Sequence, residues 1–565
     1  MRSKVEGEFL VAKAIAGTDV VVLAWDFAPD RFNLMAQRAE DQNLLGFAVE
    51  RACLGENGEL EERGWLRGIK RFEKKDPGTA PGTLMPTSEH PIQSFQWADY
   101  TVDAGQGYTY RVVPVYGKPK LLTLAEDEGV EVEVKTEPRA ALGDGVRHDV
   151  FFNRGVIGSQ AYARRFDNAE PDKLDPHSEE MKWLSRGLFE ALIEFIEQAT
   201  GPEYSLRAAF YEFHYPHVAR AFRAAVERSA DVKIVYDAES SYKATNNETI
   251  DTAGLRKYVV PRTVSEGIRH NKFIVLLKND EPVAVWTGST NISPGGIFGH
   301  SNVGHVVHDP DIANDYLAYW DRLAENLTST KLRKPNRDAT TLPKGPPWKA
   351  GTVAVFSPRD DNDSPSTLEW YANRMAEAER IVCFTVAFTI DPLFQAVLQE
   401  NNDVLRYVVK DDDLSTSENI GTDKDVVFAA GGFLDDGALV NFLKERDNPL
   451  NSNDYIHTKY MLVDPLSDNP LVVTGSANFS NASQRNNDEN MLVIRGDTRV
   501  ADIYFGEFLR TFDHHYARYV VKKMRRAKKG LDGGGGYLKV KMEEWLPPHL
   551  EEDDRKSKRR RYFVE

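Results

Sequence analysis

The sequence predicts an α/β protein in which an N-terminal all-β sandwich precedes two similar α/β/α domains that meet about a pseudo-twofold axis. Three observations support this fold class. Short alternating strands fill the first 138 residues, helical runs alternate with short apolar strands from about residue 179, and one motif occurs twice in that second region. Alternation of helices and strands is typical of layered α/β folds.

Length and composition indicate a globular chain. Its 565 residues suggest three or four domains at roughly 150 residues per domain. Hydrophobic residues make up 41% and charged residues 28%, which excludes wholesale disorder. The net charge is −16, so the chain as a whole does not attract polyanions. Any contact with a phosphate group must therefore come from a local cluster of basic side chains.

Cysteine usage and hydropathy bear on the compartment. One disulfide between Cys53 and Cys383 could not stabilise a chain of this size, and the two cysteines form no metal-ligand pattern. This cysteine usage fits a reducing compartment. The longest apolar stretch, residues 381–390, is half the roughly 20 residues that a membrane span needs. Glu6 and Glu8 interrupt the apolar core that a signal peptide requires. We therefore expect a soluble, cytoplasmic protein without an integral membrane segment.

Composition shifts along the chain suggest the domain boundaries. A proline-rich stretch precedes residue 350, and a basic run at 522–529 is followed by four glycines. The basic run is either a solvated helix end or a patch that attracts phosphate or a membrane. We expect a β-sandwich at 1–138, a connecting segment at 139–177, a first α/β half at 178–330, a linker at 331–350, a second α/β half at 351–520 and a basic, charged tail at 521–565.

The first region contains features of a known β-sandwich. Trp25 lies in an early strand candidate, and the run DAGQGYTYRV places Tyr108 and Tyr110 before the last strands, where either can form a tyrosine corner. This stretch resembles a fibronectin type III module. The resemblance implies a supporting or protein-binding module, and a fold of this kind carries no chemistry by itself.

A repeated motif dominates the rest of the chain. His270 and Lys272 form a His-x-Lys pair before an apolar strand, and His457 and Lys459 form a second pair 187 positions later. The register holds without a gap over more than 30 positions, which predicts a duplication. The same offset relates Gly288 to Gly475, Ser289 to Ser476, Asn291 to Asn478, and Asn302 to Glu489.

The repeat also predicts a shared pocket. Residues i and i+2 of a strand point to the same face, so each His projects together with its Lys. Each Gly-Ser-x-Asn element follows a second apolar run and so lies at a strand end. Two copies packed about a pseudo-twofold axis would bring two His, two Lys and two Asn side chains into one cleft that suits a single phosphate group.

These residue types point to phosphoryl chemistry. A neutral imidazole can attack phosphorus and form a phosphohistidine, and a protonated imidazole opposite can donate a proton to the leaving oxygen. The two Lys ammonium groups, the amides of Asn291 and Asn478 and the hydroxyls of Ser289 and Ser476 can neutralise the equatorial oxygens. This set of groups requires no metal and no cofactor.

The constellation resembles the phospholipase D superfamily, whose signature is His-x-Lys-x4-Asp followed by Gly-Ser-x-Asn and a later Glu or Asp. The second copy fits this signature through Asp464 and Glu489, whereas the first copy has Leu277 in place of the Asp and Asn302 opposite Glu489. The resemblance covers residues 179–520 and implies that Asp464 is a supporting residue.

The same resemblance implies roles for the histidines. His270 would be the nucleophile, held by Glu489 from the other half, and His457 would be the general acid, oriented by Asn302. The reverse assignment is chemically possible. One chain contains both half-sites, so we expect catalysis by a monomer.

The sequence leaves the substrate open. A phospholipid is our first choice, a nucleic-acid phosphodiester is the alternative, and an inactive scaffold that binds phosphate-bearing partners is a third hypothesis. In that third case the sandwich would bind a protein partner. Ile297 and Phe298 form either a loop that touches lipid or part of the core, and His300, His305 and His308 have spacings that fit no zinc site.

Overall fold

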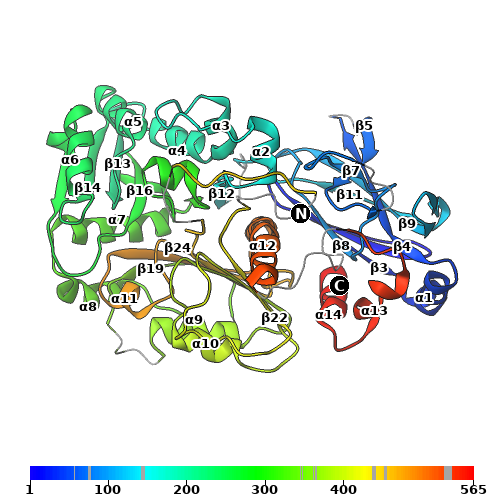
Figure 1. Cartoon of the computed structure of the whole chain (residues 1–565). Coiled ribbons are helices and arrows are strands. Elements are labelled where there is room, and N and C mark those ends of the chain that lie inside the picture. Colours follow the sequence, from blue (N-terminus) through cyan, green and yellow to red (C-terminus); the bar gives the residue numbers. More distant parts are fainter. Residues whose placement is uncertain are drawn as a thin grey trace.

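The structure is a computed structural model of the 565-residue chain. It describes residues 1–55, 58–73, 78–140, 147–343, 345–346, 348–360, 362, 365–434, 441–450, 455–526 and 537–565, with side chains except at 524–526. Figure 1 shows an elongated molecule with the N-terminal β region at one end and two α/β units at the other. We call residues 148–324 the first unit and residues 351–526 the second unit.

The N-terminal region is all-β and consists of two sheets with a shared core. Trp25 is fully buried between them and meets Phe47 edge to face at 5.6 Å between ring centroids. The first sheet has the order β1 (Arg2–Glu6), β2 (Leu10–Ala16), β3 (Val21–Phe27), β8 (Gln96–Asp99). The second has the order β10 (Leu121–Leu124), β9 (Gly107–Lys118), β4 (Leu44–Leu54), β5 (Leu60–Trp65), with β11 (Val130–Lys135) also paired to β9. Smaller elements are η1 (Pro29–Arg31), α1 (Phe32–Asp41), η3 (Glu126–Glu128) and the pair β6 (Arg67–Gly68) and β7 (Met85–Pro86).

Two tyrosines of β9 serve this core. The Tyr108 hydroxyl accepts the backbone N–H of Asp103 at 2.8 Å, and the Tyr110 hydroxyl donates to the Asp99 carboxylate at 3.0 Å. Both rings are buried. They are core residues that tie the corner between β8 and β9, because each hydroxyl has its own partner there.

The first unit is built on one mixed sheet. Its order is β12 (His148–Phe152), β18 (Val303–Val307), β17 (Glu281–Gly288), β16 (Lys272–Lys278), β13 (Tyr204–Phe210), β14 (Asp231–Asp237), β15 (Val259–Arg262). The helices are α2 (Gln160–Phe166), α3 (Glu179–Ser185), α4 (Leu188–Glu197), α5 (Pro216–Glu227), α6 (Lys243–Thr252) and α7 (Pro310–Ala324), with short turns η4 (Arg256–Tyr258) and η5 (Gly295–Gly299).

The second unit repeats this arrangement. Its sheet has the order β19 (Gly351–Ser357), β25 (Glu489–Arg495), β24 (Leu471–Gly475), β23 (Tyr460–Val463), β20 (Ile381–Val386), β21 (Leu405–Lys410), β22 (Val426–Ala430). The helices are α9 (Thr367–Ala376), α10 (Pro392–Leu398), α11 (Asn481–Arg485) and α12 (Thr498–Arg526), and α8 (Ser329–Ala339) precedes the sheet. Strand for strand, the order matches that of the first unit.

The two units pack face to face through a common core. The helices α7 and α12 lie at this interface: α7 contacts β17 and β19, while α12 contacts β22 and β12. The buried residues between the sheets form one hydrophobic cluster that includes Phe273 from one unit and Leu462 from the other. The outer faces are covered separately, by α4 and α5 on the first sheet and by α9 and α10 on the second. The strand ends that carry the two motifs therefore meet at the interface.

Three segments differ from the sequence expectation. The connecting segment 139–177 contributes β12, which pairs with β18 and completes the first sheet. The linker 331–350 begins as α8, whose Thr328 N-cap accepts the Lys331 N–H. Both sequences are polar enough to resemble loops, and tertiary packing overrides that local signal.

The C-terminal segment is the third difference. After η7 (Met542–Glu544) and α13 (Pro547–Leu550), the basic helix α14 (Arg555–Val564) packs against β3 of the sandwich and β21 of the second unit. Phe563 is fully buried against Phe505, and Lys558 and Arg560 pair with Asp425 and Asp26. Lys558 and Arg560 can be buried here because these acidic partners neutralise them. The basic run at 522–529 ends α12, but residues 527–529 and the glycines at 533–536 lie outside the described residues.

Within the part of the chain that the structure describes, none of the helices combines the length and apolar character needed to cross a bilayer.

Candidate active site

The two histidines of the repeated motif lie opposite each other across the interface. His270 stands two residues before the start of β16, and His457 stands three residues before the start of β23. Their ring centroids are 6.2 Å apart, and both residues are buried. One phosphorus atom can therefore contact both rings.

Backbone contacts between the units hold this geometry. The Ser301 N–H donates to the Tyr455 carbonyl at 3.0 Å, and the His457 N–H donates to the Ser301 carbonyl at 3.2 Å. On the other side of the pseudo-twofold axis, the Asp488 N–H donates to the Ile268 carbonyl at 2.8 Å. Each histidine is thus positioned partly by the opposite unit.

His270 is held by a carboxylate. Its Nδ1 lies 2.9 Å from Oε2 of Glu489, which is fully buried. The same oxygen accepts the hydroxyl proton of Ser476 at 2.8 Å. Because a carboxylate only accepts hydrogen bonds, Nδ1 carries the proton, and the lone pair of Nε2 is left for attack.

His457 is held by an amide instead. Its Nδ1 lies 3.0 Å from Oδ1 of Asn302, which also accepts the hydroxyl proton of Ser289 at 2.7 Å. The Asn302 amide nitrogen donates to the Gly296 carbonyl at 2.7 Å, which fixes the orientation of the amide. Nδ1 of His457 therefore carries a proton as well, and Nε2 is the atom left for proton transfer.

The two serines differ from the sequence expectation of direct phosphate contact. Ser289 and Ser476 are fully buried, and each hydroxyl proton is donated to the residue that holds a histidine. They lie behind the site. Gly288 and Gly475 permit this arrangement, because a Cβ at either position would lie 2.2–2.3 Å from a carbonyl oxygen of the next strand.

The electrostatics of the site favour neutral histidines. Burial lowers the pKa of His270 to about 4 although Glu489 opposes the shift. Burial, with Lys459 next, holds the pKa of His457 well below its usual range. Burial also lowers the pKa of Lys272 to about 8. A neutral His270 suits nucleophilic attack, and a bound phosphate anion would favour protonation of His457.

The lysines and asparagines complete the polar surface. Lys272 and Lys459 each donate one proton to the carbonyl of the histidine two residues before it. Asn291 donates to Glu212 at 2.5 Å. Among the described residues, Oδ1 of Asn291 and Oδ1 of Asn478 are buried without a hydrogen-bond partner. The two carboxamide groups therefore keep hydrogen-bonding capacity that a ligand could use.

The site opens into a cavity of about 620 Å³, which adjoins a smaller one of about 230 Å³. Phe388 and Asn478 line both cavities, and Lys459 lines the smaller one. The larger cavity is lined by both histidines of the repeated motif together with Asn291, His300 and Asn487. One wall is aromatic and acidic and consists of Tyr211, Glu212, His214, Tyr215 and Tyr242. The remaining lining residues are Lys173, Leu174, Pro216, Ile268, Ser293, Pro294, Gly295 and Leu450.

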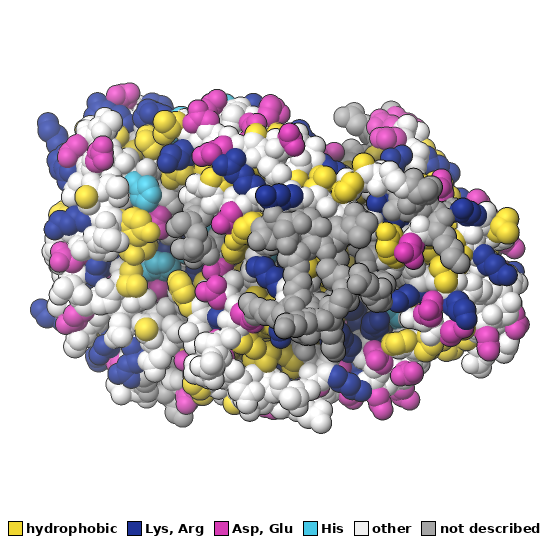
Figure 2. Space-filling view, in the orientation of Figure 1, with side chains coloured by type: hydrophobic (Ala, Val, Ile, Leu, Met, Phe, Trp, Pro, Cys, Tyr) yellow, Lys and Arg dark blue, Asp and Glu magenta, His cyan; other side chains and the backbone are white. Residues whose placement is uncertain are grey.

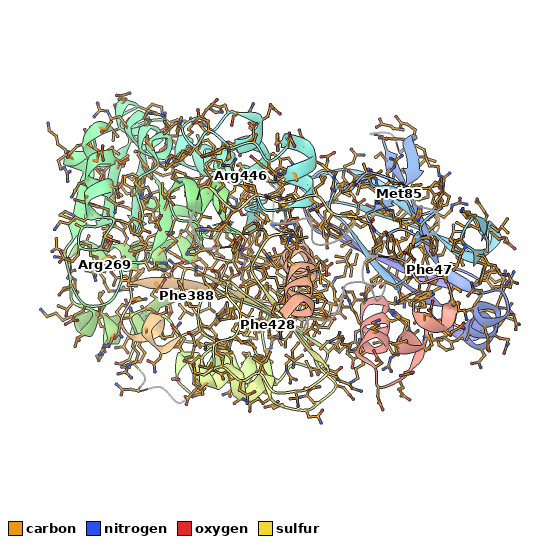
Figure 3. All side chains as sticks on the ribbon, in the orientation of Figure 1. Phe47, Met85, Arg269, Phe388, Phe428 and Arg446 are labelled. Carbon is orange, nitrogen blue, oxygen red and sulfur yellow. The ribbon has the colours of Figure 1, made fainter. Side chains whose placement is uncertain are left out.

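The mouth of the larger cavity is apolar. Leu174 is 68% exposed, Phe388 58% and Ile268 41%, and all three line this cavity. Figure 3 labels Phe388 near the boundary between the two units, and Figure 2 shows hydrophobic and histidine side chains together on that face. Of the described residues that line the larger cavity, Lys173 is the one Lys or Arg. The rim therefore offers much apolar surface and little positive charge.

The motif Asp lies away from the reacting groups. Asp464 accepts the backbone N–H groups of Glu379, Arg380 and Ile381 at 2.8–3.0 Å and so fixes the start of β20. Leu277, its counterpart in the first unit, is buried in the central core. Its presence leaves the histidine pair intact.

Several site residues were missed from sequence. Asn153, after β12, donates to the carbonyls of Ile297 and His300 at 2.8 and 2.9 Å and so holds the loop that carries Asn302. Glu212 was missed because nothing in its neighbourhood repeats. His300 had a usable signal, since the offset of 187 pairs it with Asn487. Ile297 and Phe298 are fully buried, so they belong to the core.

Comparison with known proteins gives one family match, and it falls in the two units. A family model described as "Cardiolipin synthase, PLD-like domain" matches residues 192–324 and 430–512. These two segments are similar to a PLD-like domain. The first matched segment holds His270 and the second holds His457, which agrees with the resemblance seen in the sequence. No curated protein matches the sequence.

Three solved structures are similar to parts of this chain. Phosphatidylserine synthase of Haemophilus influenzae Rd KW20 is 13% identical, with a TM-score of 0.41, over 61% of this chain and 92% of that one. The phospholipase D family member Nuc from Salmonella typhimurium is 23% identical, with a TM-score of 0.22, over 32% and 95%. Polyphosphate kinase from Porphyromonas gingivalis is 10% identical, with a TM-score of 0.36, over 54% of this chain. The match spans 46% of that kinase.

Proposed function

We propose that the chain is a phosphodiesterase-type enzyme that cleaves a phospholipid through a phosphohistidine on His270. The observation that carries the proposal is the histidine pair, with ring centroids 6.2 Å apart and unlike partners on the two Nδ1 atoms. The Glu489 carboxylate stabilises the positive charge that His270 gains on attack. The Asn302 amide orients His457 without adding charge, so His457 remains the better acid.

The reaction has two steps. Nε2 of His270 forms a bond to phosphorus, the bond from phosphorus to the leaving oxygen breaks, and Nε2 of His457 gives its proton to that oxygen. Water or an alcohol then gives a proton to His457 and attacks phosphorus, which releases His270. The ammonium groups of Lys272 and Lys459 neutralise the charge on the phosphate oxygens, and the amide N–H groups of Asn291 and Asn478 donate hydrogen bonds to them.

The rim supports a lipid substrate. Exposed Leu174, Ile268 and Phe388 surround the mouth, and apolar surface of this kind marks a lipid or protein contact. A nucleic-acid strand needs cations along its backbone, and Lys173 is the one such residue among the described lining residues of the larger cavity.

We also propose that the N-terminal sandwich is a fibronectin type III-like module. The hydrogen bond from Asp103 to the Tyr108 hydroxyl at the start of β9 supports it, since that geometry defines a tyrosine corner. Its contact with α14 supports a role as a rigid arm beside the second unit, and this arm is also where a protein partner would bind.

Turnover and trapping test the catalytic proposal. The full-length chain is incubated with bis(p-nitrophenyl) phosphate in EDTA, and we expect release of p-nitrophenol. The His457→Asn variant should accumulate an acid-labile adduct on His270, visible by intact mass and abolished by His270→Asn. Failure of the wild-type chain on every activated diester would favour the inactive scaffold.

A competition assay tests the substrate. Phosphatidylcholine vesicles and single-stranded DNA, each labelled, are mixed in one reaction with the wild-type chain. We expect cleavage of the lipid, with added ethanol or glycerol showing whether an alcohol competes with water. Cleavage of the DNA with intact lipid would instead make the chain a nuclease.

A further inference from the structure

The two histidines of the site have unlike neighbours. The offset of 187 that relates His270 to His457 also relates His300 to Asn487. His300 of the first unit lies beside His457 of the second unit, and Asn487 of the second unit lies beside the residues that hold His270. The His300 ring stacks on the His457 ring with centroids 4.6 Å apart and planes inclined by 23°. Asn487 instead accepts the Ile268 N–H at 3.1 Å and donates to Glu489 at 3.3 Å. An aromatic face thus covers the histidine that lacks a carboxylate.

His270 has an aromatic neighbour of a different kind. The Tyr211 ring lies 5.1 Å away by centroids, but its plane is tilted by 59°. It also lies under the Lys272 ammonium group at 5.5 Å. The near-parallel stack is specific to His457.

The backbone fixes the position of His300. It follows η5, its N–H donates to the Gly295 carbonyl at 3.1 Å, and its carbonyl accepts from Asn153. Gly155 allows this close approach, because a Cβ there would lie 2.6 Å from the His300 carbonyl group. Two residues on, Asn302 holds Nδ1 of His457. One short segment therefore contacts both the face and the Nδ1 edge of the same imidazole.

We propose that His300 is a positioning residue for the general acid: its neutral ring holds the plane of His457 toward the leaving oxygen and stabilises the imidazolium form. The inference rests on the proposed function. A cation gains from an aromatic face when water is excluded, and His300 is 3% exposed. His300 gives up no proton itself; the proton that reaches the leaving oxygen comes from Nε2 of His457.

The surrounding charges keep His300 neutral. Burial, followed by Lys459 and Lys272, lowers the pKa of His300 to about 3. The titratable groups that face the stacked pair are Lys459 beside β23, Lys272 and His270 from the first unit, and Glu489 through His270. All of them remain when His300 is replaced. Any charge on His300 itself would lower the pKa of His457, and a Phe at position 300 keeps the aromatic face without that charge, so comparison of the Phe and Leu variants assigns a change in acidity of His457 to the stack.

Two substitutions separate stacking from packing. His300→Phe keeps an aromatic face of similar size, whereas His300→Leu keeps an apolar side chain without that face. His300→Asn, which copies Asn487, replaces the Leu variant should that variant fail to fold. His308→Leu is the matched control, because His308 is a partly exposed histidine that pairs with Asp149 outside the cavity. Thermal melts establish that each variant is folded.

The assay uses two soluble diesters with the same retained group, one losing p-nitrophenol and one losing a simple alcohol. A good leaving group needs little help from an acid, and an alcohol needs much. We expect His300→Leu to lower kcat about tenfold for the alcohol and less than threefold for p-nitrophenol. His300→Phe and His308→Leu should stay within threefold for both substrates.

The pH profile gives the second readout. The acid must be protonated, so kcat falls as pH rises through the pKa of His457 in the complex. His300→Leu should move this basic limb to lower pH by about half a unit to one unit, and His300→Phe should leave it in place. Equal losses on both diesters, an unmoved limb, or identical Leu and Phe variants would overturn the inference. Absence of wild-type turnover on both diesters would instead overturn the proposed function.

Discussion

Replacing Glu489 by Gln tests most directly whether His270 is the nucleophile and His457 the general acid. The carboxylate is fully buried, lies 2.9 Å from Nδ1 of His270, and accepts the Ser476 hydroxyl at 2.8 Å. Glutamine keeps the volume and one acceptor oxygen but removes the charge. The ground-state hydrogen bond therefore survives, whereas the stabilisation of a positive imidazole is lost.

The expected loss follows from that one contact. A hydrogen bond to a charged group contributes about 1.5–3 kcal/mol, and the positive charge on His270 is present only after attack. The rate should therefore fall by roughly 10- to 150-fold, mainly in kcat. Asn302→Gln, at the crossed position, changes no charge and serves as a size control for a lengthened amide near a histidine.

The sign of the pH shift is also determined. His270 must be neutral to attack, so activity is lost as pH falls through its pKa, which burial lowers to about 4. Glu489 opposes that shift, so its removal lowers the pKa further and the acid limb moves to lower pH. The assay is kcat against pH on bis(p-nitrophenyl) phosphate with a thermal melt of each variant. An unchanged kcat, or an acid limb displaced to higher pH, would refute the assigned roles.

Three further predictions concern the rim, the support residue and the C-terminal helix. Phe388→Asp should lower the rate of phosphatidylcholine cleavage in vesicles at least tenfold, because it removes exposed apolar surface at the mouth of the cavity. The rate with the soluble diester should stay within threefold of wild type. Leu121→Asp, which replaces an exposed leucine on the sandwich, should change neither rate. Asp464→Ala should lower the free energy of unfolding, measured by urea titration, by about 2–4 kcal/mol, since three backbone N–H groups lose their acceptor. The kcat of this variant should be retained. A loss of kcat without destabilisation would contradict a supporting role for Asp464. Phe563→Ala should cost about 3–5 kcal/mol in the same titration, because the ring is fully buried against Phe505; a stability within 1 kcal/mol of wild type would show that α14 does not stabilise the fold.

Much of the architecture was accessible from the sequence. The spacing of the two His-x-Lys pairs predicted the duplication, and alternation of apolar and polar residues predicted short strands in the first 138 residues. β11 is one of these strands, and Val130, Val132 and Val134 face the core. These predictions depend on periodicity and offset, which are local properties of a chain. The short polar elements were missed: β12 gains its stability from pairing with β18, and α14 from burial between two domains.

The candidate site also has features that the sequence predicted and features that only the fold determined. The sequence alone determined which chemical groups exist and that they recur at one offset, because motif spacing along a strand fixes which side chains share a face. The resemblance already implied that Glu489 meets His270 and that Asn302 meets His457, and the structure has both contacts. Only the tertiary structure decided that His300 stacks on His457, that both motif serines stand behind the site, and that apolar side chains surround its mouth. Those contacts join residues from opposite units, and their geometry follows from how the two sheets pack, which no local pattern encodes.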